Sequence, residues 1–415
     1  MSSSARRTPP KLARPEPAPV VSSPAITELT RRIEDQGVGP ATAAFWAGAV
    51  SPIIEPVDAA PKERIVTFLW RDDDAESVLL FVNRITDERD LDASMMRRVP
   101  GTDVWHLSYR MGSDWRASYA FSAQYAGERA PWLDTADHLA LRRALDAGAA
   151  DPRNPLGSRN QAGQRLSIVE LPDAPAQRWL APRDGVARGT LTCREAPGDL
   201  PVRIYQPPET ARCDTYPVVV FFDGEVWTGP QDVPTTLDNL IDDGLIEPCY
   251  AILIDSGGTD RRWDLLGADG SIDRWLATEL LPWARREYPI GARREDVTVV
   301  GQSLGGASAL LALARYPDVV GRALSQSGSV WQDEVPAAIL AADLRGTRVY
   351  VEVGAQEWVL VPLHRPVVES LRAAGAEVAY VEFNGGHDYA CWRGGIADGL
   401  CRLNYTIVTA DSSQE

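Results

Sequence analysis

The first part of the chain carries two hydrophobic patterns in succession. Between residues 25 and 58, apolar side chains recur at helical spacing, as at Ile26, Leu29 and Ile33, and the stretch is long enough for two short helices. From residue 64 to residue 124 short apolar segments alternate with turn residues, which is typical of an antiparallel, immunoglobulin-like β-sandwich. The strands expected there cover residues 65–70, 78–83, 104–109 and 115–121.

The pattern changes again in the C-terminal half. Continuous apolar segments, each long enough for a buried strand, alternate with helical stretches. This alternation predicts a mostly parallel sheet with helices on both faces, as in an α/β-hydrolase. The expected strands cover residues 218–222, 251–255, 297–300, 349–353 and 378–383, and the expected helices cover residues 272–288, 306–315 and 366–374.

Composition divides the chain into domains at the places where the patterns change. At 415 residues the chain is too long for one hydrophobic core. Residues 1–24 are rich in Ser, Pro, Ala and Arg and predict a disordered tail. Residues 151–185 are rich in Pro, Gly, Asn and Arg and predict a linker between an N-terminal domain (residues 25–150, two helices and the sandwich) and a catalytic domain (residues 186–415).

Charge and cysteine usage exclude several classes of function. The chain has 42 Lys and Arg against 58 Asp and Glu, a net charge of −16, which argues against nucleic acid and membrane as partners. No apolar run reaches about 18 residues and the N-terminus lacks the apolar core of a signal peptide, so we expect a cytoplasmic protein. Five cysteines without a C-x-x-C pair and four scattered histidines predict neither a disulfide framework nor a metal site.

Residues 301–305 (GQSLG) are the sharpest local motif. They follow an expected apolar strand and precede an Ala- and Leu-rich helix. In this context G-x-S-x-G is typical of a nucleophile elbow, because the tight, strained turn that exposes the serine leaves no space for neighbouring side chains. We therefore predict Ser303 as a catalytic nucleophile.

A serine hydroxyl needs a base that accepts its proton. His387 lies in residues 384–388 (NGGHD), a loop that follows the last expected strand, whereas the competing His364 precedes a helix. We predict His387 as the base.

The acid of the triad is expected after the preceding strand, in the chain order Ser, acid, His. Glu357 lies in the loop at the carboxyl end of residues 349–353. Glu352 lies inside that strand, and Asp388 adjoins the histidine too closely to reach its far nitrogen. We therefore favour Glu357.

The oxyanion of the tetrahedral intermediate needs two preorganised donors. The amide of Leu304, directly after the nucleophile, is the expected first donor. The second is expected after residues 218–222, where we favour the Glu225 amide over that of Gly224.

Beyond the elbow, several strings of residues resemble the enterochelin (ferric enterobactin) esterases from about residue 40 to the C-terminus. In the C-terminal half these are residues 222–227 (FDGEVW), 301–306 (GQSLGG), 324–329 (LSQSGS), 385–388 (GGHD) and 391–395 (CWRGG). In the N-terminal half they are residues 66–71 (VTFLWR), 101–105 (GTDVW), 115–119 (WRASY) and 151–155 (DPRNP). The GGHD and CWRGG strings combined with these N-terminal strings are far more specific than G-x-S-x-G alone.

The resemblance implies an enzyme that hydrolyses the serine ester bonds of an imported ferric tricatecholate trilactone such as enterobactin. It assigns Ser303 as nucleophile, His387 as base and Glu357 as orienting carboxylate, and it implies no external cofactor, with iron as cargo. A general carboxylesterase or acyltransferase of the same fold, and a siderophore-binding protein without catalysis, are the alternatives.

An anionic, aromatic ferric chelate implies a pocket with arginines and flat rings. The expected substrate-binding residues come after the expected oxyanion loop, after the expected strand 251–255, after the string at residues 324–329, or after His387. They are Trp227, Arg261, Arg262, Trp331, Trp392 and Arg393. Residues 263–268 (WDLLGA) depart from the His-Glu-Leu-Pro and following Asn that are usual in the family.

Overall fold

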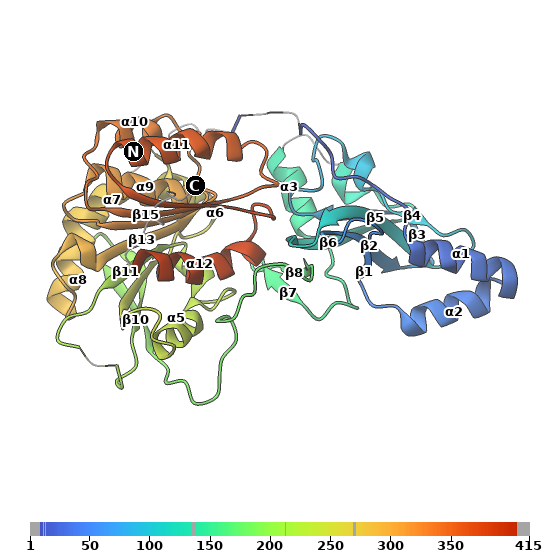
Figure 1. Cartoon of the computed structure of the whole chain (residues 1–415), viewed down its shortest axis with the longest axis horizontal. Coiled ribbons are helices and arrows are strands. Elements are labelled where there is room, and N and C mark those ends of the chain that lie inside the picture. The colour runs from blue at the N-terminus through green and yellow to red at the C-terminus, as the bar shows by residue number, and fades with distance from the viewer. Residues whose placement is uncertain are drawn as a thin grey trace, which may run out of the picture. The chain divides into compact units, whose positions relative to one another are not determined.

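A computed structural model describes residues 9–10, 12, 14–133, 138–211, 213–268 and 271–404. The chain forms two compact units (Figure 1). The sandwich unit contains Ala13–Ala176 and Asn384–Cys391, and the parallel-sheet unit contains Met1–Leu12, Gln177–Phe383 and Trp392–Glu415. The segment Asn384–Cys391 therefore belongs to the sandwich unit although it follows the last strand of the other unit.

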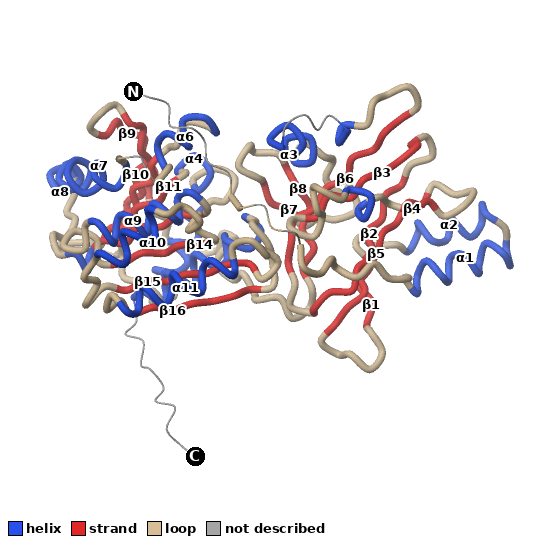
Figure 2. The backbone as a smooth tube through the Cα atoms, turned by 90° about the horizontal axis from the view of Figure 1, so that it is seen from above, coloured by secondary structure: helices blue, strands red, loops and turns tan. Residues whose placement is uncertain are grey.

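The sandwich unit consists of two four-stranded antiparallel sheets, in the orders β1-β2-β5-β4 and β3-β6-β8-β7. Alternate side chains of both sheets meet in one apolar core, where Phe68 packs edge-on against Tyr109 and Tyr119. The elements are α1 (Pro24–Gln36), α2 (Val38–Gly48), β1 (Ile53–Pro56), β2 (Glu63–Arg71), β3 (Ala75–Val82), η1 (Leu91–Ser94), β4 (Arg97–Arg98), β5 (Val104–Gly112), β6 (Arg116–Tyr125), η2 (Pro131–Leu133), α3 (His138–Asp146), β7 (Gly157–Arg159) and β8 (Arg165–Glu170). The predicted β-sandwich is confirmed, and α1 and α2 lie side by side as the two predicted helices (Figure 2).

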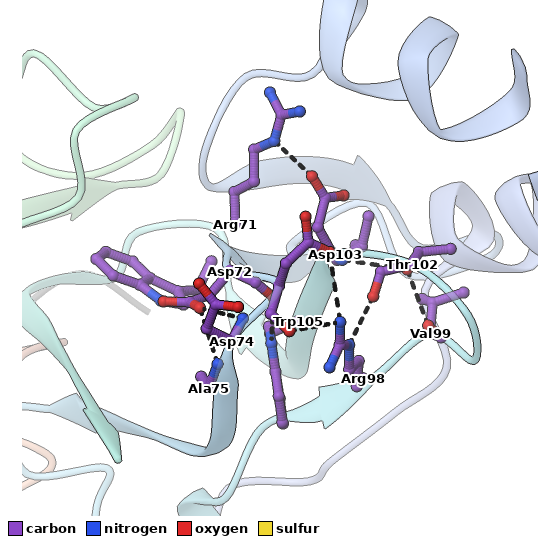
Figure 3. Close-up of polar contacts among 12 residues, drawn as sticks. Arg71, Asp72, Asp74, Ala75, Arg98, Val99, Thr102, Asp103 and Trp105 are labelled. Atoms are coloured by element: carbon purple, nitrogen blue, oxygen red, sulfur yellow. Dashed lines mark hydrogen bonds and ion pairs between the residues drawn. The ribbon is translucent and has the colours of Figure 1, made fainter. Parts of the chain in front are cut away.

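One of the N-terminal strings of the resemblance forms a hairpin turn (Figure 3). In residues 101–105 the Thr102 hydroxyl donates to the Val99 carbonyl (2.8 Å), and the Arg98 guanidinium donates to the Thr102 carbonyl (2.6 Å). The Asp103 carboxylate accepts from Arg71 (2.6 Å) and from the indole of Trp46 (2.7 Å). The motif thus fixes the turn and fastens α2 to the sandwich.

Two predicted boundaries need correction. Strands β7 and β8 lie inside the predicted linker (residues 151–185), because apolar residues of β8 complete the second sheet, and the sandwich unit extends to Ala176. Within the predicted disordered tail (residues 1–24), Val20 forms an isolated antiparallel bridge with Tyr109 of β5, so the chain is hydrogen-bonded to the sheet at this point. Residues 1–8, 11 and 13 of that prediction lie outside the described residues.

The parallel-sheet unit is built on one eight-stranded sheet in the order β16-β15-β14-β13-β11-β12-β10-β9, in which β10 pairs antiparallel with both of its neighbours, β12 and β9, and the other neighbouring strands pair in parallel. The strands are β9 (Thr190–Ala196), β10 (Leu200–Gln206), β11 (Val218–Phe222), β12 (Tyr250–Ile254), β13 (Val297–Gln302), β14 (Arg322–Gln326), β15 (Arg348–Gly354) and β16 (Glu377–Phe383). All five strands predicted for this half are present. The central strands are buried on both faces, which explains their continuous apolar pattern.

Helices cover both faces of this sheet. Figure 1 shows α9, α10 and α11 over one face and α5 and α12 over the other. The helices are α4 (Gly224–Trp227), α5 (Val233–Asp242), α6 (Thr259–Leu266), α7 (Ile272–Trp275), the π-helical turn η3 (Leu276–Leu280), α8 (Leu281–Glu287), η4 (Arg294–Asp296), α9 (Leu304–Arg315), α10 (Glu334–Ala341), α11 (Val361–Ala373) and α12 (Tyr389–Asn404). The predicted doubly covered, mostly parallel sheet is confirmed.

Candidate active site

Ser303 lies at the turn between β13 and α9 in a strained backbone conformation, with φ 56° and ψ −117°. A β-carbon on Gly301 would lie 2.1 Å from the carbonyl oxygen of Gly305, so the turn tolerates no side chain there. The Ser303 amide donates to the Gln326 carbonyl (3.0 Å), and the Ser303 carbonyl accepts from the Ser329 amide (2.8 Å). These contacts hold a half-buried serine at the carboxyl end of the sheet, as a nucleophile elbow requires.

The expected oxyanion donors lie at the ends of two neighbouring strands. Leu304 is the first residue of α9, and Glu225 is the second residue of α4, which follows β11. β11 and β13 pair in parallel, so the two helix N-termini lie at the same edge of the sheet. Amides in the first turn of a helix have no partner within the helix, which suits them to bind an oxyanion.

The side chain of Glu225 has a separate contact. Its carboxylate accepts from the Ser256 amide (2.9 Å) and from the Ser256 hydroxyl. Any role of Glu225 toward the oxyanion therefore falls to its main-chain N–H, as predicted.

Arg262 connects the elbow with the turn after β11. Its guanidinium donates to both carboxylate oxygens of Asp223 (2.6 and 2.8 Å) and to the Gln302 carbonyl (3.2 Å), and the residue is only 8% exposed. Its charge is paired with a buried aspartate, and its predicted role as a substrate ligand stays a prediction. Arg262 positions the two turns that carry the expected oxyanion donors.

Two of the predicted substrate-binding tryptophans are also buried. Trp227 donates its indole N–H to Gln302 (2.8 Å), and Trp392 donates its own to the Ser327 hydroxyl (3.1 Å). They are 1% and 3% exposed. Their predicted role toward the substrate stays a prediction.

The other three substrate-binding candidates keep accessible surface. Arg261 is exposed, and the half-buried Trp331 lies against Trp263 with the ring centroids 6.5 Å apart. Arg393 is half-buried and donates to Gln177 (3.0 Å). Their role toward substrate stays a prediction.

Glu357 lies in the turn after β15 and is 2% exposed. Its Oε1 accepts from the Ser327 hydroxyl (2.5 Å) and from the Gly354 amide (3.0 Å). The Ser327 hydroxyl also accepts from the Trp392 indole. Glu357, Ser327 and Trp392 therefore form one hydrogen-bonded group. The carboxylate is thereby fixed in position.

The alternative acid, Glu352, belongs to a different group. It accepts from Gln326 (2.6 Å) and from the Tyr350 hydroxyl (2.9 Å). Burial raises its pKa to about 7, against the opposing effect of these two hydrogen bonds. The contact of Gln326 with Glu352 was not predicted from the LSQSGS string. Small and polar residues do not indicate a buried strand, and only the fold shows that Gln326 is fully buried.

The two candidate bases differ in their surroundings. His364 is fully buried inside α11, with its Nδ1 2.8 Å from the Leu360 carbonyl oxygen of its own helix. His387 lies in the segment Asn384–Cys391 of the sandwich unit, and its carbonyl accepts from the side chain of Asn83 (2.9 Å). The predicted nucleophile and acid thus lie in the parallel-sheet unit, and the predicted base lies in a segment of the sandwich unit.

Neither a metal centre nor a membrane span is found in the part of the chain that the structure describes. There, three or more His, Cys, Asp or Glu side chains never gather in a metal-binding arrangement. Over the same residues, each helix is too short or too polar to cross a bilayer.

A nucleophile elbow at the carboxyl end of a doubly covered parallel sheet defines an α/β-hydrolase, and such a serine site serves the hydrolysis of carboxylic esters. Comparison with known proteins agrees with this class. Residues 65–180 match the family described as "Enterochelin esterase, N-terminal", and residues 194–403 match the family described as "Putative esterase". The chain belongs to the enterochelin esterase family, and the resemblance found in its sequence is confirmed.

Individual relatives match along most of their length. The chain is 33% identical to the iron(III) salmochelin esterase of Escherichia coli O6:H1, with 86% of this chain and 92% of the relative covered. It is 30% identical to the iron(III) enterobactin esterase of Escherichia coli K12, with 81% and 90% covered.

Solved structures agree. The ferric enterobactin esterase of Salmonella typhimurium has a TM-score of 0.75 at 29% identity, covering 87% of this chain and 98% of that one. The enterobactin esterase of Shigella flexneri, solved in the presence of enterobactin, has a TM-score of 0.70 at 28% identity, covering 87% and 97%.

Proposed function

We propose that this protein hydrolyses the serine ester bonds of a ferric catecholate siderophore such as enterobactin, and that it does so in the cytoplasm, where the iron is released for use. The observation that carries the proposal is Ser303, held at φ 56° on the turn between β13 and α9 in a chain of the enterochelin esterase family. Relatives named as iron(III) enterobactin and salmochelin esterases support the substrate class.

The proposed reaction uses the chain's own residues. The Ser303 hydroxyl attacks the ester carbonyl carbon while His387 accepts its proton, and Glu357 orients the resulting imidazolium. The amides of Leu304 and Glu225 bind the oxyanion. The tetrahedral intermediate collapses, the ester C–O bond breaks, and His387 returns the proton to the departing serine alkoxide. Water, deprotonated by His387, then releases the acyl chain and regenerates Ser303.

Ser303→Ala tests the chemistry. Its turnover of ferric enterobactin, followed by mass spectrometry of the released dihydroxybenzoyl-serine species, should fall by at least about 10³-fold. Ser308→Ala is the matched control, since Ser308 is a buried serine of α9 whose hydroxyl contacts the carbonyls of Leu266 and Leu304. Full activity of Ser303→Ala would overturn the proposal.

A general carboxylesterase of the same fold is the second candidate. It is favoured by the burial of Arg262, Trp227 and Trp392, three of the six expected chelate contacts, and by the departure at residues 263–268. A noncatalytic siderophore-binding protein would leave the strained serine without a use.

Arg261→Ala and Arg393→Ala separate the two enzymes. If these arginines bind a ferric catecholate, each substitution should raise KM for ferric enterobactin roughly tenfold and leave KM for p-nitrophenyl acetate unchanged. Equal behaviour toward both substrates would favour the general esterase.

A further inference from the structure

The loop that carries His387 is fastened to the sandwich unit by contacts from both sides of the histidine. Before it, the Arg116 amide donates to the Asn384 carbonyl (3.2 Å), and the Asn384 side chain donates to Asp114 (2.7 Å). After it, the Cys391 thiol lies 3.4 Å from the Arg116 carbonyl oxygen. The segment Asn384–Cys391 is therefore part of this unit by its hydrogen bonds as well as by its packing.

The contacts nearest to the histidine come from the end of β3 and the beginning of β6. The Asn83 side chain donates to the His387 carbonyl (2.9 Å), while the Asn83 amide donates to the Ser118 carbonyl of β6 (3.0 Å). Asn83 is 4% exposed, and its side-chain oxygen has no hydrogen-bond partner in the described structure. Its amide group thus contributes one directed donor to the histidine's backbone.

Asp388 holds the other side of the histidine. Its Oδ2 accepts from the Ser118 amide (2.6 Å), and its Oδ1 accepts from the Ala390 amide in the first turn of α12 (2.9 Å). One 5%-exposed carboxylate thereby fastens the residue after His387 to β6 and also caps the helix that follows.

Gly386 shows how closely the loop lies against this surface. A β-carbon there would lie 2.6 Å from Asn83 Oδ1 and 2.8 Å from Arg84 Cβ. The position before His387 has no space for a side chain, because the backbone itself lies against the end of β3.

From these contacts the structure assigns a catalytic task to the N-terminal unit: Asn83, together with the Ser118 amide and Asp388, positions the backbone of the general base His387. This inference rests on the proposed function of His387. The sandwich unit acts on the reaction through the base rather than through contact with the substrate. Loss of these hydrogen bonds therefore slows proton transfer by His387 to the same extent for every ester.

Asn83→Leu tests the assignment, because leucine keeps the shape of asparagine and removes the donor. We expect kcat to fall about ten- to a hundredfold on both ferric enterobactin and p-nitrophenyl acetate, with KM within about twofold, because small displacements of a catalytic group cost up to about 10²-fold. Rates are taken per folded protein, with thermal unfolding and circular dichroism measured on the same samples.

Asn154→Leu is the matched control. Asn154 is another buried asparagine of the sandwich unit, donating to the Tyr119 hydroxyl (2.9 Å) and the Ile168 carbonyl (2.7 Å). Its loss should lower the melting temperature without changing kcat at a temperature where the variant is folded. An equal loss of kcat in both variants, or wild-type kcat in Asn83→Leu, would overturn the assignment.

His387→Ala separates this inference from the proposed function. If His387 is the base, this variant loses about 10³-fold or more in kcat, and adding Asn83→Leu to it causes no further loss. A further loss in the double variant overturns the positioning role alone. Retained activity in His387→Ala overturns the proposed function itself.

Discussion

A row of buried polar side chains connects the ends of three neighbouring strands next to the serine. The Trp227 indole donates to Gln302 (2.8 Å), Gln302 donates to Gln326 (2.7 Å), and Gln326 donates to Glu352 (2.6 Å). An indole N–H can only donate, and the main-chain carbonyl of Trp392, which also accepts from Gln326 (2.8 Å), can only accept, so both amides between them have a single orientation. This row fixes Gln302, the residue before the nucleophile.

The carboxyl group at the end of that row should make stability depend on pH. Burial raises the pKa of Glu352 to about 7 from its ordinary 4.5, so the folded state retains a proton that the unfolded state has lost between these values. Its contribution to the free energy of unfolding is present in full below pH 4.5 and is lost as the pH rises through 7. We therefore expect the free energy of unfolding to fall less from pH 5 to pH 8 in Glu352→Gln than in wild type. Urea denaturation at each pH measures this change.

The control for this prediction is Glu369→Gln, which changes an exposed glutamate of α11. It should follow the wild-type dependence on pH. Parallel curves for Glu352→Gln and wild type would show that the buried carboxyl group does not titrate in this range.

Single residues were predictable where the local sequence requires them. Ser303 was predictable because G-x-S-x-G describes a turn whose sterics are local, and its elbow is present. Arg262, Trp227 and Trp392 were predicted as substrate contacts, yet all three are buried. Burial of a long or aromatic side chain depends on partners such as Asp223 and Ser327, whose proximity arises only in the fold.

At the scale of elements, the turns after β11 and β13 depend on a buried ion pair. The Asp223 side chain is fully buried, and that residue adopts a left-handed conformation at φ 57° before α4. We expect Arg262→Met to lower the free energy of unfolding by about 3–5 kcal/mol, because it leaves an unpaired buried carboxylate. Urea denaturation measures the loss.

Arg261→Met is the matched control, since the neighbouring arginine is exposed on the same helix. Its free energy of unfolding should stay within about 0.5 kcal/mol of wild type. A similar small change in Arg262→Met would mean that the ion pair contributes little to the fold.

Strands were predictable in proportion to their apolar content. β11, β12, β13, β15 and β16 are apolar runs and were predicted, whereas β14 (RALSQ) was not predicted as a strand. Its Ser325 and Gln326 are fully buried polar residues. β7 and β8 were assigned to a linker because the surrounding Pro and Gly outweighed the three apolar residues of β8, Leu166, Ile168 and Val169.

At the scale of the whole chain, each unit has its own apolar core. Composition predicted two domains, but it could not predict that residues 384–391 return to the first of them. Their membership depends on main-chain and short side-chain hydrogen bonds, such as that from Ser118 to Asp388, which leave no hydrophobic pattern in the sequence.

Local stability should therefore follow the units rather than the order of the chain. Phe68→Leu, a change in the fully buried core of the sandwich, should cost about 1–2 kcal/mol and make that unit exchange its amides faster. In hydrogen-exchange mass spectrometry we expect residues 384–391 to lose protection together with β3 and β6, while β15 and β16 keep theirs. Esterase activity should be lost at the same urea concentration as the amide protection of β6, because unfolding of the sandwich unit also unfolds the segment that carries His387. Exchange of residues 384–391 in step with β16 would contradict this division.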